Sequence, residues 1–405
     1  MKCGLLGKTL GHSYSPDIHA FLGEYSYELF EKQPSELEDF LKNGSFTGLN
    51  VTMPYKKDVI PYCDILTDRA KKLGAVNTLV KKADGTLLGH NTDYFGFQSM
   101  LDRMGLTVEG KKVLMLGSGG ASATAVAVLQ ESGANVVVIS RTGANNYGNI
   151  ELHRDAAVIV NATPVGMYPN AGTTPVDLSL FSSLEGVLDI VYNPARTRLM
   201  LDAEAMGIPT KNGLWMLVAQ AKEASEWFTG NKLDDCVIEK IHSNLRKKME
   251  NIVLIGMPGC GKSTIGQIVA DTTGKTLVDI DAEIERASQM SIPDIFTKHG
   301  EEYFRKLETK TLAAFGQKSG LVIATGGGCV TREKNYSHLH QNGTIYWLQR
   351  DINELPIDGR PLSQTGKLNE MYIKRKPMYT RFADAVILND ADPGKAAAEI
   401  AKGWL

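Results

Sequence analysis

Short apolar runs alternate with longer amphipathic stretches along the chain, an arrangement typical of parallel α/β units. In the first half the runs predict strands at Val113–Leu116, Val136–Ile139, Val158–Val160 and Val187–Val191. In the second half they predict strands at Ile252–Ile255, Thr276–Ile280, Leu321–Ala324, Thr344–Leu348 and Ala385–Leu388. Two strands lead into glycine-rich loops, which begin at Gly117 and Gly256 and differ in glycine spacing. The two halves are therefore not copies of one repeat.

A stripe of apolar residues with helical spacing lies where the two halves of the chain join. Its apolar residues recur every fourth position, at Leu233, Val237, Ile241 and Leu245. This spacing predicts a helix from Leu233 to Lys248. The basic triplet Arg246-Lys247-Lys248 has an alternative interpretation as a nucleic-acid patch, but the dipole of a helix favours such residues at its C-terminus. Because the next strand starts at Asn251, we expect two globular bodies with almost no linker near Glu250.

Composition narrows the class of protein. At 405 residues, and with about 150 residues per domain, two or three domains are expected. Hydrophobic residues make up 43% and charged residues 22%, which is ordinary for a globular protein. The formal net charge of −2 provides no overall cationic field, so the chain predicts neither a nucleic-acid partner nor a membrane partner. Its oligomeric state is left open.

The compartment follows from the cysteines and the N-terminus. Five cysteines are scattered without a C-x-x-C pair, which argues against a disulfide framework and a zinc site and suits a reducing compartment. Lys8 interrupts the first apolar stretch before a secretory signal could form. No apolar run reaches the roughly 18 residues of a membrane span. We therefore expect a cytoplasmic protein.

The strongest local motif is a phosphate-binding loop. Residues 256–263 read G-M-P-G-C-G-K-S, with a predicted strand before them and a predicted helix after them. Glycines let backbone N–H groups converge on phosphate oxygens, a lysine reaches the terminal phosphates, and a hydroxyl coordinates Mg²⁺. The expected nucleotide-binding residues are Gly256, Gly259, Gly261, Lys262, Ser263 and Thr264. A hydrolase, a kinase and a switch all remain possible on this motif alone.

Further polar features follow the loop. Asp279-Ile280-Asp281 closes the next predicted strand, where alternation along the strand would send both carboxylates to one face. After them come Arg305, the triplet Gly326-Gly327-Gly328, Arg360-Pro361-Leu362 and Arg375. Each of these features also has an alternative interpretation in which it serves only the fold. Arg305 and Glu308, for example, stand at the spacing of an ion pair on a helix surface, and a glycine triplet forms turns.

Together these motifs resemble shikimate kinase, and the resemblance covers the chain from about residue 251 onwards. It implies that Asp281 binds the substrate diol and acts as the base, and that Asp279 serves Mg²⁺ together with Ser263. It also implies that Arg305 and Arg375 hold the substrate carboxylate while Gly326, Gly327 and Gly328 approach the ring. Lys262 and the lid residue Arg360 would neutralise the transferring phosphoryl group of ATP. The stretch from Gln349 to Arg360 is several residues shorter than the family's lid region.

The first half contains a weaker loop motif. In Gly117-Ser118-Gly119-Gly120-Ala121-Ser122 the third glycine of a dinucleotide fingerprint is replaced by serine. The next strand ends in Ser140-Arg141-Thr142, where an enzyme specific for NAD would have an acidic residue. An arginine there favours the 2′-phosphate of NADP, although a surface arginine after a strand is the plain alternative.

Seven polar segments accompany this loop. They are residues 13–16 (S-Y-S-P), 48–56 (G-L-N-V-T-M-P-Y-K), 74–78 (G-A-V-N-T), 89–93 (G-H-N-T-D), 161–167 (N-A-T-P-V-G-M), 189–194 (D-I-V-Y-N-P) and 213–220 (G-L-W-M-L-V-A-Q). Short polar residues in glycine-rich turns are often only turn formers. In this order, however, the segments resemble shikimate dehydrogenase, and the resemblance covers residues 1 to roughly 249.

This second resemblance implies a catalytic pair, in which Lys56 passes a proton to the C3 oxygen and Asp93 hydrogen-bonds both the lysine and the substrate. It implies substrate contacts from Ser13, Ser15, Thr52, Asn77, Tyr192 and Gln220. It implies NADP contacts from Gly117, Gly119, Gly120, Ala121, Ser140, Arg141 and Thr142. The span from Arg141 to Asn161 is shorter than is typical by about a helix and a strand, and Asn145 stands where a second arginine is expected.

The sequence thus predicts a fusion of the two enzymes in an α/β chain. Residues 1–105, completed by 207–249, would form a substrate domain, residues 106–206 a Rossmann domain for NADP, and residues 251–405 a three-layer P-loop kinase domain with a parallel sheet. The implied chemistry is reduction of 3-dehydroshikimate to shikimate and then phosphorylation to shikimate 3-phosphate with ATP and Mg²⁺, which serves aromatic amino acid biosynthesis. Two alternatives are a quinate/shikimate dehydrogenase that uses NAD and a kinase-like half that only binds shikimate as a regulator.

Overall fold

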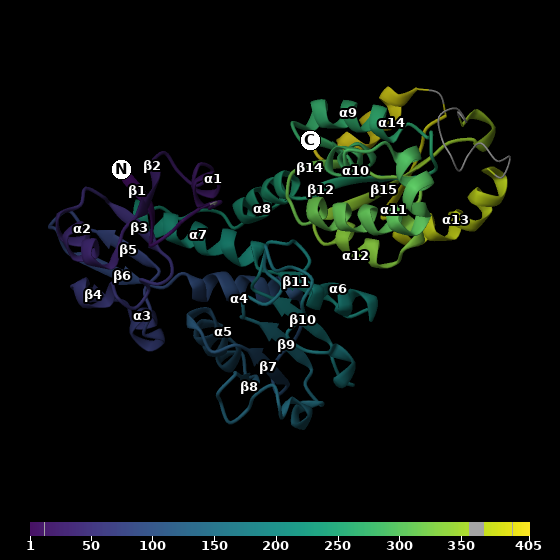
Figure 1. The fold of residues 1–405 in the computed structure, drawn as a ribbon. Coiled ribbons are helices and arrows are strands. Elements are labelled where there is room, and N and C mark those ends of the chain that lie inside the picture. The colour runs from purple at the N-terminus through teal and green to yellow at the C-terminus, as the bar shows by residue number, and fades with distance from the viewer. Residues whose placement is uncertain (12, 356–367, 391) are drawn as a thin grey trace. The chain divides into compact units, whose positions relative to one another are not determined.

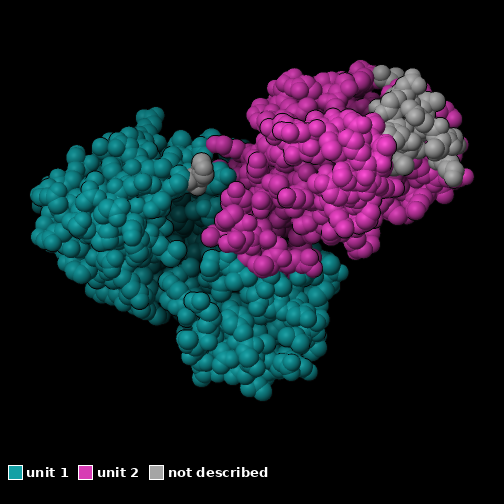
Figure 2. Space-filling view, in the orientation of Figure 1, with its two compact units in different colours: residues 1–165, 174–192, 202–244 teal, residues 166–173, 193–201, 245–405 magenta. Residues whose placement is uncertain are grey.

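The computed structural model describes residues 1–11, 13–355, 368–390 and 392–405. It divides into two compact units, which Figure 2 colours separately. The first unit contains residues 1–165, 174–192 and 202–244, and the second contains residues 166–173, 193–201 and 245–405. A finer division at residues 105 and 206 stays a prediction. Within the described ranges, no helix has the length and apolar content needed to cross a bilayer.

The first unit begins with a mixed sheet whose strand order is β2-β1-β3-β5-β6-β4. The strands are β1 (Lys2–Gly7), β2 (Ser26–Glu31), β3 (Gly48–Val51), β4 (Ile65–Leu66), β5 (Thr78–Lys81) and β6 (Leu87–His90). Strand β5 runs antiparallel to both neighbours. Its pairing with β6 follows from the short link between them, which leaves no room for a crossover helix. Helices α1 (Ser15–His19), α2 (Leu37–Asn43), α3 (Asp68–Leu73) and α7 (Leu214–Thr229) belong to the same unit.

The second sheet of this unit is entirely parallel, in the order β11-β10-β9-β7-β8. Its strands are β7 (Lys112–Leu116), β8 (Asn135–Ile139), β9 (Val158–Asn161), β10 (Gly186–Asp189) and β11 (Thr210–Asn212). All four predicted strands are confirmed to within two residues. Strand β11 was not predicted because its three residues are only partly buried and form no apolar run. Helices α4 (Asp93–Met104) and α5 (Gly120–Glu131) belong to the same unit, and the residues of α6 (Arg198–Ala205) are divided between the two units.

The shortened span after β8 leaves that strand at the edge of the sheet. Between β8 and β9 the chain forms only a single 3₁₀ turn, at Ile150–His153. A further strand and helix at this position would have covered the edge.

The third sheet lies in the second unit and is also parallel, in the order β13-β14-β12-β15-β16. Its strands are β12 (Asn251–Ile255), β13 (Thr276–Asp279), β14 (Leu321–Ala324), β15 (Gly343–Gln349) and β16 (Ala385–Leu388), so all five predicted strands are confirmed. Figure 1 shows α9 (Lys262–Thr273) and α14 (Pro393–Lys402) on one face and α11 (Ile292–Gly316) and α12 (Lys334–His340) on the other. The remaining helices are α10 (Ile280–Ser288) and α13 (Leu368–Phe382).

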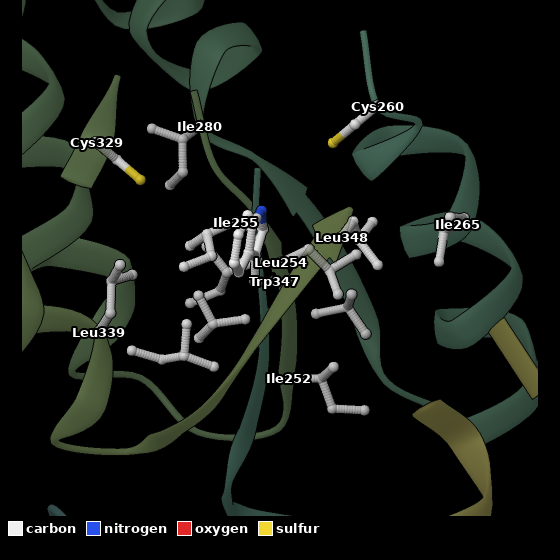
Figure 3. Close-up of a cluster of buried hydrophobic side chains, with 14 of the residues drawn as sticks. Ile252, Leu254, Ile255, Cys260, Ile265, Ile280, Cys329, Leu339, Trp347 and Leu348 are labelled. Carbon is white, nitrogen blue, oxygen red and sulfur yellow. The ribbon is translucent and has the colours of Figure 1, made fainter. Parts of the chain in front are cut away.

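The core of the second unit surrounds β12. Every residue of this strand is buried, which is expected of a parallel strand covered on both faces. In Figure 3 the side chains of Leu254 and Ile255 lie near Trp347 and Leu348 of the adjacent strand β15, and Ile252 lies further along β12 in the same core cluster. This packing holds the strand that ends in the phosphate-binding loop, so the core fixes where the loop starts.

The predicted joint helix is α8, which spans Cys236–Met249. It begins after Asp234, whose carboxylate accepts a hydrogen bond of 2.7 Å from the N–H group of Cys236. Its buried face consists of Ile238, Ile241, Leu245 and Met249. The expected stripe was therefore correct at two of its four positions, and Leu233 lies before the helix. Glu250 alone separates α8 from β12, as the linkerless joint required.

The close packing of α11 on α12 yields a first prediction. A Cβ atom added at Gly316 would lie 1.9 Å from the carbonyl oxygen of His338. Gly316→Ala should therefore lower the free energy of unfolding of the second unit by about 1–3 kcal/mol, the usual effect of overpacking, as measured by urea denaturation. Ala314→Ser, at an exposed position of the same helix, is the matched control. Equal stability of both variants would contradict the packing seen here.

Candidate active sites

The catalytic pair expected in the first unit is formed. Lys56 lies in the turn after β3, and Asp93 is the first residue of α4. Lys56 Nζ donates a hydrogen bond of 2.5 Å to Asp93 Oδ2. The two side chains are only 22% and 11% exposed, so this is not the loose surface pair of the structural alternative. A lysine held this way has a fixed direction and keeps limited access to solvent.

Next to Asp93, hydrogen bonds connect three polar side chains from distant segments of the chain, Asn77, Thr92 and Gln220. Asn77 Oδ1 accepts the N–H group of Thr92 at 2.7 Å, and Asn77 Nδ2 donates to Gln220 Oε1 at 3.4 Å. Thr92 Oγ1 lies 3.3 Å from the same Gln220 oxygen. Asn77 and Thr92 are fully buried, and Gln220 comes from α7. The amide and hydroxyl groups of these three side chains lie close together, an arrangement suited to hydrogen-bonding the ring hydroxyls of a small polyol.

The segment expected to receive a carboxylate lies at the start of α1. The Ser15 N–H group donates to Ser13 Oγ at 3.2 Å. Tyr14 packs edge-on against Tyr192, with 6.4 Å between the ring centroids. The structure therefore brings Ser13, Ser15 and Tyr192 into one neighbourhood, while Thr52 follows β3 and is partly buried.

Sequence reasoning missed two residues here. Tyr27 of β2 donates through its hydroxyl to Asn50 Oδ1 at 2.8 Å, and Asn50 Nδ2 is buried with no hydrogen-bond partner in the described part of the chain. His19 stacks on Tyr27 at 4.0 Å, and burial lowers the pKa of His19 to about 3, which keeps the ring neutral. Asn50 belonged to a quoted motif and could have been found there. Tyr27 had no signal, because only the sheet pairing places it.

The dinucleotide-type loop has room for a ligand. Gly117 has φ of +106°, Gly119 precedes α5, and a Cβ atom at either Gly119 or Gly120 would meet nothing within 4 Å. Ser122, which replaces the third glycine, is buried and donates through Oγ to the carbonyl of Gly117 at 2.7 Å. The serine thus braces the loop instead of disturbing it. An open helix N-terminus of this kind suits a pyrophosphate.

The segment after β8 is arranged as a turn. Ser140 Oγ accepts the N–H group of Gly143 at 2.9 Å, and Arg141 and Thr142 are exposed beyond it. Ser140 is therefore occupied by the turn itself, while the guanidinium of Arg141 is accessible to a ligand. Asn145, which stands where a second arginine was expected, faces His153 at 3.2 Å.

In the second unit the phosphate-binding loop borders a cavity of about 630 Å³. Lys262 is buried and donates to the carbonyl oxygens of Gly256 and Met257, each at 3.0 Å. Gly259 and Gly261 have φ of +84° and +94°, a conformation that glycine adopts without strain. Thr264 also lines the cavity. The ammonium is therefore held by its own loop, within reach of a phosphate bound there.

The cavity contains a donor set suited to magnesium. Ser263 Oγ donates to Asp279 Oδ2 at 2.5 Å, so a hydroxyl and a carboxylate oxygen already meet. Hard oxygen ligands of this kind, completed by waters and phosphates, are what Mg²⁺ prefers. The residues present fit the ion.

The two aspartates share the cavity for a reason that differs from the expected one. Strand β13 ends at Asp279, whose Oδ1 caps α10 by accepting the N–H groups of Asp281 and Ala282 at 3.0 and 3.2 Å. Asp281 is thus helical, and the prediction that strand alternation aligns the pair was wrong. Asp281 Oδ1 is buried without a hydrogen-bond partner among the described residues. Burial, followed by the charge of Asp279, raises the pKa of Asp281.

Two of the arginines expected at this site, Arg305 and Arg375, line the same cavity. Arg305 Nη1 donates to Glu308 Oε2 at 2.8 Å, and Nη2 donates to Glu301 Oε1 at 3.1 Å. Arg305 is 6% exposed and Glu308 is fully buried, so this pair does not lie on a helix surface. Burial raises the pKa of Glu308 to about 7 despite the neighbouring guanidinium. Arg375 donates through Nη1 to the carbonyl of Gly327 at 3.1 Å.

A Cβ atom at any position of the triplet would overlap a neighbour, and the neighbour differs from one position to the next. A Cβ atom at Gly326 would lie 2.7 Å from both Asp281 Oδ1 and Glu308 Oε1. At Gly327 it would lie 2.6 Å from Pro258 of the phosphate-binding loop, and at Gly328 it would lie 2.2 Å from the Arg305 guanidinium. The triplet is therefore more than a turn. The expected lid residue Arg360 lies outside the described residues.

Both halves of the chain match known protein families. A shikimate kinase family model matches residues 258–403, and a model of the shikimate dehydrogenase substrate-binding domain matches residues 5–79. Shikimate dehydrogenase (NADP(+)) of Clostridium perfringens is 36% identical over 265 residues, covering 60% of this chain and 97% of that enzyme.

Solved structures agree over the same part. A chorismate mutase/shikimate 5-dehydrogenase fusion protein from Clostridium acetobutylicum is 33% identical, with a TM-score of 0.58, and the match covers 61% of this chain and 97% of that one. Shikimate 5-dehydrogenase from Thermus thermophilus, solved with NADP(H) and shikimate, is 32% identical, with a TM-score of 0.55, and the match covers 60% of this chain and 98% of that one.

The buried carboxyl group of Glu308 yields a second prediction. Because its pKa in the folded protein is raised from the usual 4.5 to about 7, its contribution to stability is complete below pH 4.5 and is lost as the pH rises through 7. Glu308→Gln should remove this dependence, an effect on the order of 2–3 kcal/mol in the free energy of unfolding of the second unit. Urea denaturation at several pH values measures it. Parallel pH profiles for wild type and variant would show that Glu308 titrates normally.

Proposed function

We propose that this chain, which belongs to the shikimate dehydrogenase family over its first three-fifths and carries a shikimate kinase domain over residues 258–403, catalyses two consecutive reactions of the shikimate pathway. The first reaction reduces 3-dehydroshikimate to shikimate with NADPH. The second phosphorylates the 3-hydroxyl of shikimate with ATP. The product of the first site is thus the substrate of the second.

In the reduction, Lys56 is the proton donor. NADPH, when bound, supplies a hydride to C3, and the C3 oxygen takes a proton from Lys56 Nζ, so the carbonyl becomes an alcohol. Asp93 orients the lysine through their 2.5 Å contact, and the partial exposure of Lys56 lets water return the proton. Asn77, Thr52 and Gln220 bind the ring hydroxyls, while Ser13 and Ser15 bind the carboxylate. Tyr192 lines the pocket.

In the phosphorylation, Asp281 accepts the proton of the substrate hydroxyl. Its raised pKa keeps it a better base than an ordinary aspartate. Arg305 and Arg375 hold the substrate carboxylate by charge-assisted hydrogen bonds, Ser263 and Asp279 hold Mg²⁺, and Lys262 neutralises the phosphates. The observation that carries this proposal is the single cavity in which the phosphate-binding loop, both aspartates and both arginines meet.

The choice of cofactor rests on Arg141. It lies two residues after β8, the strand that follows the dinucleotide-type loop, and is exposed, whereas an acidic residue there would repel the 2′-phosphate of NADP. The curated relative from Clostridium perfringens is an NADP(+) enzyme. We therefore assign NADP to the open N-terminus of α5, contacted by Gly117, Gly119, Gly120 and Ala121.

The decisive experiment is one reaction with the whole chain, 3-dehydroshikimate, NADPH and Mg-ATP, followed by mass spectrometry. Shikimate 3-phosphate is the expected product. Accumulation of shikimate alone would leave the dehydrogenase intact and would make the second unit a shikimate- or nucleotide-binding regulator. Absence of both products would refute the proposed direction of reduction.

Matched variants assign each step to its site. Lys56→Ala should abolish reduction and leave phosphorylation of added shikimate unchanged, because the two sites use separate residues. Lys262→Ala should have the opposite effect. Lys57→Ala, at the exposed neighbouring position, is the control for the first variant. Loss of both activities in Lys56→Ala would disprove independent sites.

The assignment of Arg141 is tested by cofactor kinetics. Arg141→Ala should raise KM for NADPH roughly tenfold, the effect of losing one charge-assisted contact, and leave KM for NADH nearly unchanged. Arg154→Ala, which removes an exposed arginine paired with Glu151 at 2.8 Å, controls for a general loss of positive charge. An equal change with both cofactors would place the 2′-phosphate elsewhere.

A further inference from the structure

Tyr379 is a fully buried tyrosine on α13, four residues after Arg375. Its ring stacks on Trp347 of β15, with 5.6 Å between centroids and planes 20° apart. Its hydroxyl donates to the carbonyl oxygen of Gly327 at 2.5 Å. Burial raises the pKa of Tyr379, so the hydroxyl remains a donor throughout the range in which the enzyme is assayed.

The carbonyl oxygen of Gly327 accepts hydrogen bonds from two side chains. Besides the Tyr379 hydroxyl it accepts Nη1 of Arg375 at 3.1 Å, so one oxygen fixes two side chains of the same helix. On its other side Gly327 packs so closely on Pro258 that no Cβ atom fits. The Tyr379 hydroxyl lies 3.8 Å from Met257 Sδ in the same loop. Helix α13, the glycine triplet and the phosphate-binding loop therefore meet at this point.

The arrangement constrains the guanidinium of Arg375. An arginine has five N–H donors in a rigid plane, and the bond to Gly327 engages one of them, which sets the direction of the others. Arg375 lines the cavity, and its direction depends on where the Gly327 carbonyl points. Tyr379 holds that carbonyl with the shorter of the two hydrogen bonds. The tyrosine itself is not among the residues that line the cavity.

We propose that Tyr379 is a positioning residue for recognition of the substrate carboxylate in the second unit, acting through Gly327 and Arg375. The proposal rests on the phosphorylation of shikimate proposed above. It assigns to the tyrosine hydroxyl a role in selecting an anionic acid over a neutral analogue, apart from any role of the ring in packing.

The test is Tyr379→Phe, which removes the hydroxyl and keeps the ring on Trp347. With ATP saturating, KM for shikimate should rise roughly three- to tenfold, the range for one hydrogen bond. Shikimate methyl ester has no carboxylate charge, so its inhibition constant against shikimate phosphorylation should change less than about twofold. KM for ATP and kcat should stay within about twofold.

Tyr372→Phe is the matched control. Tyr372 lies on the same helix, and its hydroxyl accepts a hydrogen bond from Gln349 at 3.3 Å, away from Gly327. It should leave KM for shikimate unchanged. Reduction of 3-dehydroshikimate by each variant, together with its thermal melting, verifies that the chain is folded.

The outcomes separate the two proposals. If wild type does not phosphorylate shikimate, the proposed function fails and this inference fails with it. If wild type is active and Tyr379→Phe weakens shikimate and its methyl ester equally, or weakens neither, the proposed function stands and the positioning role is refuted. A loss of thermal stability with unchanged KM would likewise reduce Tyr379 to a packing residue.

Discussion

In both halves a buried parallel strand ends in a glycine-rich loop at the start of a helix, and in the second unit the other functional groups lie around that junction. Strand β12 is buried at all five residues, and β7 at four of five. A strand held from both faces cannot shift, so the loop that leaves its carboxyl end has a fixed origin. In the second unit Asp281, Arg305 and Arg375 then line one cavity with that loop, although they come from different helices.

The second constraint is the burial of several charged side chains around one cavity. Arg305 and Glu308 are both buried and tolerated because they pair, since an isolated charge there would be far too costly. Asp281 Oδ1 has no hydrogen-bond partner among the described residues, and burial together with the charge of Asp279 raises the pKa of Asp281. The glycine triplet adds a steric condition, because side chains at these positions would overlap Asp281, Pro258 and Arg305. Reactivity at this site thus follows from burial and close approach together.

Two departures from the expected family patterns are absorbed differently. Ser122 occupies the place of a glycine, and the structure accommodates it through a hydrogen bond to Gly117 that closes the loop. The shortened segment after β8 is not compensated by another strand in the described residues, and β8 remains an edge. A single substitution can be corrected by a local contact, whereas a missing strand and helix remove surface that no neighbour replaces.

The sequence by itself determined the strands of the two parallel sheets, except β11, and the phosphate-binding loop, because these depend on local apolar runs and on the backbone freedom of glycine. It also determined which polar segments belong together, including Lys56, Asp93 and the Arg305 segment. Only the tertiary structure decided how they meet. Asp281 enters the cavity from a helix turn, and Glu308 is buried instead of exposed. Asn50 receives its partner Tyr27 from another strand of its sheet, and Tyr379 on α13 bonds the loop residue Gly327. The contacts of Asn50 and Tyr379 join residues 23 and 52 positions apart, and no local pattern records the distance between them.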